Sequence, residues 1–271
     1  MMIDKPVVVI TGGAGGIGEA TAIKFAENGF VPVLVDVDEN ALHRVSASLQ
    51  ALTSDAWIMA GDLQGGDFLK EIVETTMEKY GRIDVLVNNA AWRSIGTMRS
   101  ISLEDWEKTI RINLTAPAFL AKYAAAAMEK QGRPGVIVNL SSIMSSRAAG
   151  YSPAYTTCKG GVESLTYELA VLYGPSQIRV VCIAPGNVDT NMSKDYINSA
   201  DANISHDLVN EMETSTPLKR SASPAEIANA IYWISSAEAS FITGTTLNID
   251  GGFSKNFNAY TSKKRLNPGE F

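Results

Sequence analysis

The stretch VVVITGGAGGIG, residues 7–18, decides the fold of this chain, because a short apolar run passes directly into a glycine-rich turn. Between a buried strand and a helix, such a turn lets the backbone approach a pyrophosphate, and the helix N-terminus offers amide donors. The spacing G-x-G-x-x-G alone is a weak pattern that an ordinary tight turn also satisfies. Its position after the first apolar run favours a dinucleotide-binding turn.

Six further runs rich in Val and Ile follow, separated by longer amphipathic stretches. Strands that are apolar on both faces suit a parallel sheet covered by helices, and parallel strands need crossover connections, so the pattern predicts a doubly wound α/β fold. We expect one Rossmann-like domain over residues 1–271, with seven parallel strands and helices on both faces. The predicted strands are Val7–Ile10, Val31–Val35, Ala56–Ala60, Val85–Val87, Val136–Leu140, Val180–Ala184 and Thr246–Ile249.

Local signals mark several helix ends: Gly29 as a C-terminal stop, Ser102 with Asp105 as a start, and Pro153 and Pro224 as first residues.

Two segments break the alternation of strands and helices. Residues 187–217 form a polar, mostly acidic insertion after a strand, which predicts a substrate-binding loop or lid. Residues 253–271 form an aromatic-containing tail that docks on a neighbouring subunit or closes the pocket, with disorder of residues 262–271 as the alternative.

Composition excludes several classes of partner. A net charge of -6 argues against nucleic acid or an anionic membrane surface. The first apolar run is too short for a signal peptide or a membrane span. Because Cys158 and Cys182 are far too few for a disulfide framework, we expect free thiols and a cytoplasmic location. The two histidines, His43 and His206, lie far apart, so we expect no metal.

Asp36 ends the second predicted strand, where a carboxylate accepts hydrogen bonds from the adenosine ribose hydroxyls. The extra phosphate of NADP would meet this negative charge, and neither Gly15 nor Val37 offers a cation to bind it. The sequence therefore favours NAD. Asp62, with Leu63 beside it, follows the third strand and is a candidate for the adenine edge.

Tyr155 and Lys159 are four positions apart on a predicted helix and therefore share a face. A phenol with a pKa near 10 needs about 4 kcal/mol of phenolate stabilisation to act near neutrality, and a nearby ammonium supplies much of this. Ser142 follows the carboxyl end of the predicted strand Val136–Leu140, where the cofactor crevice of such a sheet opens, and its hydroxyl is a candidate to hold the reacting oxygen. Asn113 lies inside a long predicted helix, where an amide needs backbone or water as its partner.

Taken together, these residues resemble the short-chain dehydrogenase/reductase family from Val7 to Gly252. The matching motifs are Thr-Gly-x3-Gly-x-Gly at 11–18, Asn88-Asn89-Ala90, Asn113, Ser142, Tyr155-x3-Lys159, and Pro185-Gly186 with Thr190. Ala91 departs from the family's usual glycine, and the tail after Gly252 is longer than usual.

The resemblance implies an NAD-dependent enzyme that moves a hydride between the cofactor and a secondary alcohol or ketone. Tyr155 then donates or accepts the proton, Lys159 also bonds the nicotinamide ribose, Ser142 positions the substrate oxygen, and Asn113 holds a relay water. The resemblance also implies a homo-oligomer, with a tetramer favoured over a dimer. The expected cofactor-binding residues are Thr11, Gly12, Gly15, Gly16, Ile17, Gly18, Asp36, Val37, Asp62, Leu63, Asn89, Ala90, Ala91, Tyr155, Lys159, Pro185, Gly186, Val188 and Thr190.

Two arginines direct the substrate prediction. If Arg93 and Arg147 face the catalytic centre, they bind a carboxylate, which predicts a hydroxy acid or sugar acid. Surface ion pairing of both arginines is the alternative, and a neutral sugar or polyol then remains as substrate. We expect the pocket to be lined by Trp92, Arg93, Ser94, Ser142, Met144, Arg147, Tyr151, Tyr155 and Asn187. A 3-oxoacyl-type ketoreductase and a non-catalytic dinucleotide-binding regulator are the competing functions.

Overall fold

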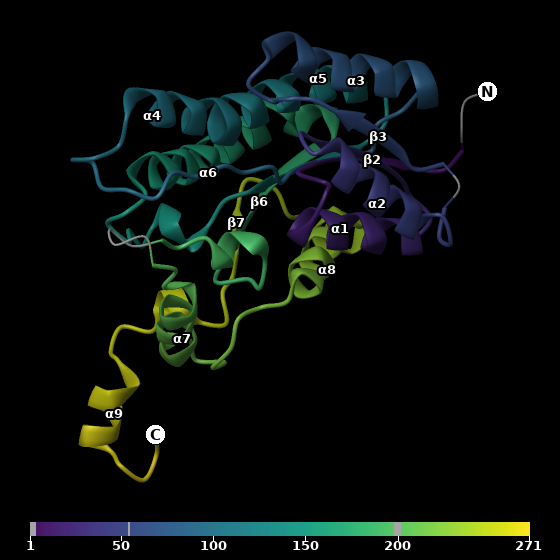
Figure 1. Ribbon diagram of the computed structural model, residues 1–271. Coiled ribbons are helices and arrows are strands. Elements are labelled where there is room, and N and C mark those ends of the chain that lie inside the picture. Colours follow the sequence, from purple (N-terminus) through teal and green to yellow (C-terminus); the bar gives the residue numbers. More distant parts are fainter. Residues whose placement is uncertain (1–3, 54, 198–201) are drawn as a thin grey trace.

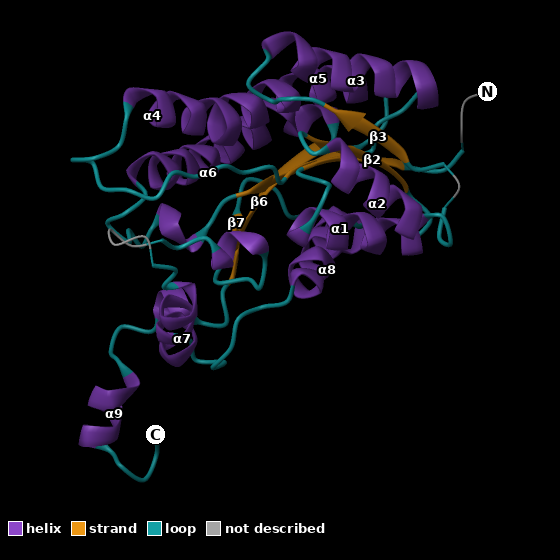
Figure 2. Ribbon diagram, viewed as in Figure 1, coloured by secondary structure: helices purple, strands orange, loops and turns teal. Residues whose placement is uncertain are grey.

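The computed structural model describes residues 4–53, 55–197 and 202–271. Within these residues seven parallel strands form one sheet in the order β3-β2-β1-β4-β5-β6-β7. Figures 1 and 2 show this sheet between two layers of helices. The predicted fold class and strand positions are confirmed, and strand ends differ from the prediction by at most two residues. The strands are β1 Val7–Thr11, β2 Val31–Asp36, β3 Trp57–Ala60, β4 Val85–Asn88, β5 Gly135–Leu140, β6 Ile178–Pro185 and β7 Thr246–Ile249.

Helices cover both faces of the sheet because its strands are apolar on both sides. Alternate residues of β1 enter opposite cores: Val7 and Val9 belong to one buried cluster, and Val8 and Ile10 to the other. The first cluster lies under α3 (Gly66–Tyr80), α5 (Ala116–Gln131) and α6 (Pro153–Tyr173), and the second under α1 (Gly16–Glu27), α2 (Glu39–Leu49) and α8 (Pro224–Ser235).

The predicted helix ends are confirmed. Gly29 follows α1 with a φ angle of 82°. Ser102 caps α4 (Leu103–Ile110), since its Oγ accepts a hydrogen bond from the Asp105 amide at 3.0 Å. Pro153 and Pro224 are the first residues of α6 and α8.

The lid and the tail lie beyond the sheet. The predicted lid contains a 3₁₀ turn at Asn191–Lys194 and helix α7 (Ser205–Ser215); its residues 198–201 lie outside the described residues. The tail forms helix α9 (Tyr260–Leu266), which extends away from the sheet in Figure 1. For residues 262–271 the sequence allowed disorder as an alternative, and the structure has part of this segment in helix α9.

The order of strands changes direction between β1 and β4, which lie side by side although they are far apart in the sequence. In such a sheet the crevice outside the carboxyl ends of these strands is the usual ligand site. No helix in the described residues is long and apolar enough to cross a membrane. Cys158 and Cys182 are both buried free thiols, as predicted.

Candidate active site

The turn between β1 and α1 excludes side chains at two of its glycines. A Cβ atom on Gly18 would lie 1.9 Å from the carbonyl oxygen of Gly12, and one on Gly12 would lie 2.8 Å from the side-chain nitrogen Nδ2 of Asn89. Gly12 and Gly16 also have φ angles of 65° and 55°, which favour glycine. A Cβ on Gly15 would meet nothing within 4 Å. The backbone is therefore open here, and the free amides that begin α1 fit a pyrophosphate.

Side chains fix the separation of β1 and β4 at the crevice. Thr11 Oγ1 accepts hydrogen bonds from the backbone amides of Asn89 and Ala90, both at 3.1 Å. In return, the Asn89 side-chain amide donates to the carbonyls of Thr11 and Gly12 at 3.0 and 3.1 Å. The motif residues Thr11, Asn89 and Ala90 therefore join the two loops of the crevice.

The end of β6 brings the lid against the glycine turn. Gly186 follows the last residue of β6, Pro185, and a Cβ on it would lie 2.8 Å from the Asp250 Cα, so a side chain is excluded. Thr190 starts the 3₁₀ turn of the lid, and its Cγ2 would lie 3.2 Å from a Cβ on Gly16. Thr190 thus covers the turn that the sequence assigned to the cofactor.

Asp36 borders a cavity of about 210 Å³ at the other end of the crevice. Its carboxylate accepts hydrogen bonds from the backbone amides of Val37 at 2.8 Å and Ala14 at 3.1 Å, so its position is fixed. Lys108 of α4 also lines the cavity, and its Nζ lies 4.4 Å from the centroid of the Trp92 ring. The lining residues are Gly12, Asp36, Val37, Gly61, Asp62, Leu63, Gln64, Ala90, Ala91, Trp92, Lys108 and Ile112.

Tyr155, Lys159 and Ser142 come together at the carboxyl end of β5. Tyr155 lies in the first turn of α6 and Lys159 one turn later; the two residues are 8% and 3% exposed. The Lys159 Nζ lies 5.2 Å from the centroid of the Tyr155 ring and donates to the Leu140 carbonyl at 2.6 Å. Ser142 lies near Tyr155, and its hydrogen-bonding effect favours the phenolate.

Burial dominates the acidity of both groups. It raises the pKa of Tyr155 to about 12, whereas the charge of Arg93 and the hydrogen bond from Ser142 act in the opposite direction. Burial also lowers the pKa of Lys159 to about 8. Among the causes that act on Tyr155, the cation that favours the phenolate is Arg93. The predicted lowering of the Tyr155 pKa by Lys159 stays a prediction.

Asn113 lies in a π-helical turn, Arg111–Thr115, between α4 and α5, and is completely buried. Its side-chain amide donates to the carbonyls of Trp92 at 2.6 Å and Thr109 at 2.9 Å, and its Oδ1 accepts from the Trp92 amide at 3.4 Å. The side chain therefore bonds the backbone, as its position in a helix requires, and anchors the loop after β4. The relay water remains a prediction.

Arg93 binds the lid. Its Nη1 donates to the Tyr196 hydroxyl at 3.0 Å, and its Nη2 donates to the Met192 carbonyl and forms an ion pair with Asp195. The side chain is 6% exposed, and its Nε has no hydrogen-bond partner within the described residues. Sequence reasoning missed Asp195 and Tyr196, because their pairing with Arg93 spans about a hundred positions and leaves no local pattern.

Arg147 is bound elsewhere. It donates to the carbonyls of Phe253 at 2.8 Å and Asn256 at 3.4 Å, at the base of the tail. The expected pair of guanidinium groups free to bind a carboxylate is therefore not present, since Arg93 pairs with the lid and Arg147 with the tail. The alternative of surface ion pairing is met only in part: Arg93 forms an ion pair with Asp195 but is buried, and Arg147 bonds backbone carbonyls.

Three further predicted site residues lie in different places. The Met144 amide donates to Ser142 Oγ at 3.2 Å, so Met144 lies beside the candidate centre. Asn187 instead donates from its side chain to Ser221 Oγ at 2.6 Å. Val188, the predicted carboxamide neighbour, is buried and bridges to Ala222.

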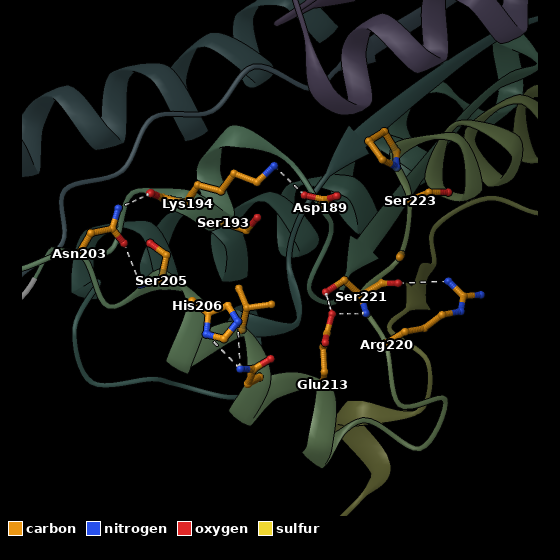
Figure 3. A pocket seen from close by; sticks show the side chains of 14 residues that line it. Asp189, Ser193, Lys194, Asn203, Ser205, His206, Glu213, Arg220, Ser221 and Ser223 are labelled. Atoms are coloured by element: carbon orange, nitrogen blue, oxygen red, sulfur yellow. Dashed lines mark hydrogen bonds and ion pairs between the residues drawn. The ribbon is translucent and has the colours of Figure 1, made fainter.

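A larger cavity of about 740 Å³ lies among the lid turn, α7 and the segment before α8 (Figure 3). Its charged groups are already paired within the protein: Lys194 with Asp189 at 2.9 Å, Arg220 with Glu226 at 2.6 Å, and Glu213 with the amide and hydroxyl of Ser221. Neither Tyr155 nor Lys159 lines it. The candidate chemistry therefore lies outside this cavity.

Comparison with known proteins identifies the family. A family model described as enoyl-(acyl carrier protein) reductase matches residues 12–254. An uncharacterized oxidoreductase of Thermotoga maritima is 37% identical over 252 residues, which cover 93% of this chain and 96% of that protein. The chain belongs to the short-chain dehydrogenase/reductase family of oxidoreductases.

Two further relatives have named substrates. The cis-4-hydroxycyclohexanecarboxylate dehydrogenase of Sinomonas cyclohexanicum is 35% identical over 248 residues, 91% of this chain and 96% of that protein. The crystal structure of an NAD⁺-bound xylitol dehydrogenase matches with a TM-score of 0.84 and 27% identity, over 91% of this chain and 98% of the other. The relatives thus include enzymes named for a hydroxy acid and for a polyol.

Proposed function

We propose that this chain is an NAD-dependent oxidoreductase that moves a hydride between the nicotinamide and a secondary alcohol or ketone. The observation that carries the proposal is the meeting of Tyr155, Ser142 and Lys159 at the crevice whose other wall is the glycine turn. When bound, the nicotinamide takes up or supplies the hydride.

The residues of the chain supply the proton transfer. In alcohol oxidation, the deprotonated Tyr155 oxygen accepts the hydroxyl proton; in ketone reduction, the protonated phenol donates its proton to the carbonyl oxygen. The Ser142 hydroxyl donates to the same substrate oxygen and holds it beside Tyr155. Lys159 bonds the nicotinamide ribose from the next turn of α6, and the amides that begin α1 hold the pyrophosphate.

Asp36 supports NAD over NADP. Its carboxylate lines the cavity at the end of β2, where a ribose 2′-hydroxyl donates to it and a 2′-phosphate is repelled by it. Lys108 lines the same cavity, and it stacks on Trp92. We therefore expect NAD to be preferred, and an assay with both cofactors tests this.

For the substrate we propose a small molecule with more than one oxygen: a polyol, sugar, sugar acid or hydroxy acid. The buried, unpartnered Nε–H of Arg93 is a donor that a second substrate oxygen would satisfy. The names of the hydroxycyclohexanecarboxylate and xylitol dehydrogenases support this range. A panel of these compounds assayed for NAD reduction, with an acyl thioester as the ketoreductase alternative, tests it.

The Tyr155→Phe variant tests the function itself. Loss of the phenol removes the proton acceptor, so we expect kcat/KM to fall by about a thousandfold, in the range of general acid–base contributions, while NAD binding measured by calorimetry is retained. Retained turnover would contradict the mechanism. An absence of turnover in the wild-type protein on the whole panel, with NAD bound, would favour the regulatory alternative.

We further propose that the chain acts as a single-domain, cytoplasmic homo-oligomer, with a tetramer favoured. Leu103 on α4 is 73% exposed and Phe119 on α5 is 42% exposed, and such apolar side chains suit a subunit interface. Light scattering coupled to size-exclusion chromatography measures the subunit number.

A further inference from the structure

The cavity beside Asp36 is lined by charges of both signs. Two carboxylates, Asp36 and Asp62, lie at the ends of β2 and β3. Another part of the lining comes from α4 and the π-helical turn after it, through Lys108 and Ile112, which are four positions apart and share a helix face. Among the described residues that line the cavity, Lys108 is the only cation. A ligand that fills this small space therefore meets one positive and two negative side chains.

Lys108 is held against an aromatic ring. Its Nζ lies 4.4 Å from the centroid of the Trp92 ring, and Trp92 lines the same cavity. Trp92 is itself fixed, since the side chain of Asn113 bonds both its amide and its carbonyl. In residues 4–53, 55–197 and 202–271 Lys108 forms no ion pair. The ring attracts the ammonium through its face but accepts no conventional hydrogen bond, so the N–H donors of Lys108 stay free for a ligand.

The carboxylates of the cavity are bonded within the chain, and neither neutralises Lys108. Asp36 accepts hydrogen bonds from two backbone amides, and Asp62 accepts from the amide and the side chain of Gln64. A charged ligand group in the cavity is therefore acted on by both signs at once. The energy between two charges falls only with the first power of their distance, so attraction by Lys108 offsets part of the repulsion by Asp36.

Resting on the proposed function, we propose that Lys108 is a second determinant of cofactor choice. Its ammonium attracts the 2′-phosphate that Asp36 repels, and it thereby reduces the preference for NAD that Asp36 produces. A lysine ammonium is a compact charge on a flexible stem with rotatable donors, which suits a phosphate monoester. The sequence directed attention to Gly15 and Val37 as places for such a cation, whereas the fold brings one from α4.

The test is calorimetry with ADP-ribose and 2′-phospho-ADP-ribose, which lack the nicotinamide and so report binding without turnover. In Lys108→Met we expect the affinity for 2′-phospho-ADP-ribose to fall by about tenfold and that for ADP-ribose by less than about twofold. Lys108→Arg keeps the charge and most of the affinity. Lys122→Met is the matched control, because the Lys122 Nζ also lies over an aromatic ring, 5.6 Å from the Phe119 centroid, but outside the cavity.

The double variant separates the two charges. In Asp36→Asn the affinity for 2′-phospho-ADP-ribose rises, and adding Lys108→Met removes most of that gain, since the remaining attraction is lost. The salt dependence gives a further readout. Because screening by salt weakens the pairing of an ammonium with a phosphate, the affinity for 2′-phospho-ADP-ribose falls less steeply with salt in Lys108→Met than in wild type. Urea unfolding shows that each variant is folded.

An unchanged ratio of the two affinities in Lys108→Met would overturn the inference. An equal loss for both ligands would also overturn it, since Lys108 would then bind a part that the two share. In either case binding of ADP-ribose and Tyr155-dependent turnover in the wild-type protein leave the proposed function standing. A wild-type protein that binds neither ligand is a failure of the proposed function, and it is seen before any Lys108 variant is made.

Discussion

The cofactor side and the substrate side of the crevice are built differently. On the cofactor side, the contacts involve the backbone: the Gly18 position has no space for a Cβ, and the side chains of Thr11 and Asn89 bond the main chain of the facing loop. On the substrate side, the contacts are made by long side chains: Arg93 forms an ion pair with Asp195, and Arg147 donates to a backbone carbonyl at the base of the tail.

This difference teaches where change is tolerated. Where the backbone of one loop lies against the backbone of another, few amino acids fit at that position. Two side chains that bond each other can be replaced by another pair without moving the strands of the sheet. We therefore expect substitutions on the cofactor side to damage the protein generally, and those on the substrate side to alter selectivity or proton transfer. Four predictions test this contrast, from the largest effect to the smallest.

Gly18→Ala gives the largest effect. The new Cβ would lie 1.9 Å from the Gly12 carbonyl oxygen, so the turn or α1 must move. We expect about 3 kcal/mol of lost stability, the upper range for overpacking, together with loss of NAD binding. Urea unfolding and calorimetry measure both. Gly66→Ala, where a Cβ meets nothing within 4 Å, is the matched control; equal losses in both variants would break the argument.

Lys159→Met changes the dependence of stability on pH. The pKa of Lys159 is lowered from 10.5 to about 8 in the folded protein, so between these values the unfolded chain binds more protons and stability rises with pH. Cys158 and Cys182 act oppositely above pH 9; because Lys159 lowers the pKa of both thiols, its loss raises these pKa values further and adds to the difference in the same direction. From pH 8 to 10 we expect wild type to gain about 2 kcal/mol relative to the variant in urea unfolding. A constant difference would contradict the lowered pKa.

Asp36→Asn alters cofactor choice. Removing the charge relieves repulsion of the 2′-phosphate, so the ratio of kcat/KM for NAD to that for NADP falls by about tenfold, equivalent to roughly 1.4 kcal/mol. Initial rates with both cofactors measure it. Asp38→Asn, two residues further along at the N-cap of α2, is the control; an unchanged ratio in Asp36→Asn would remove the basis for the NAD assignment.

Arg147→Gln gives the smallest effect. The side chain is exposed and bonds two tail carbonyls, so we expect a stability change within about 0.5 kcal/mol. The Michaelis constant should change no more for hydroxy acids than for polyols. A selective rise for acids would restore Arg147 to the substrate pocket.

Much of the fold was predictable because its signals are local. Each strand is a contiguous apolar run, and Ser102, Pro153 and Pro224 mark helix starts through contacts with adjacent residues. The residues of the crevice were predictable for the same reason, through motifs such as Tyr155-x3-Lys159. Lys108 and Ile112 of the Asp36 cavity were not, since only the packing of α4 and of the π-helical turn after it brings them there.

The sequence by itself determined the sheet, the glycine turn and the residues that meet around Tyr155. The signals for these features are local, because apolar runs and motif spacings involve residues close together in the sequence. Only the tertiary structure decided the partners of Arg93 and Arg147 and the burial of Lys159. Arg93 pairs with Asp195 of the lid, Arg147 bonds the base of the tail, and burial lowers the pKa of Lys159 to about 8. Electrostatic influence depends on burial and on distance through space, and neither is contained in the spacing of residues along the chain.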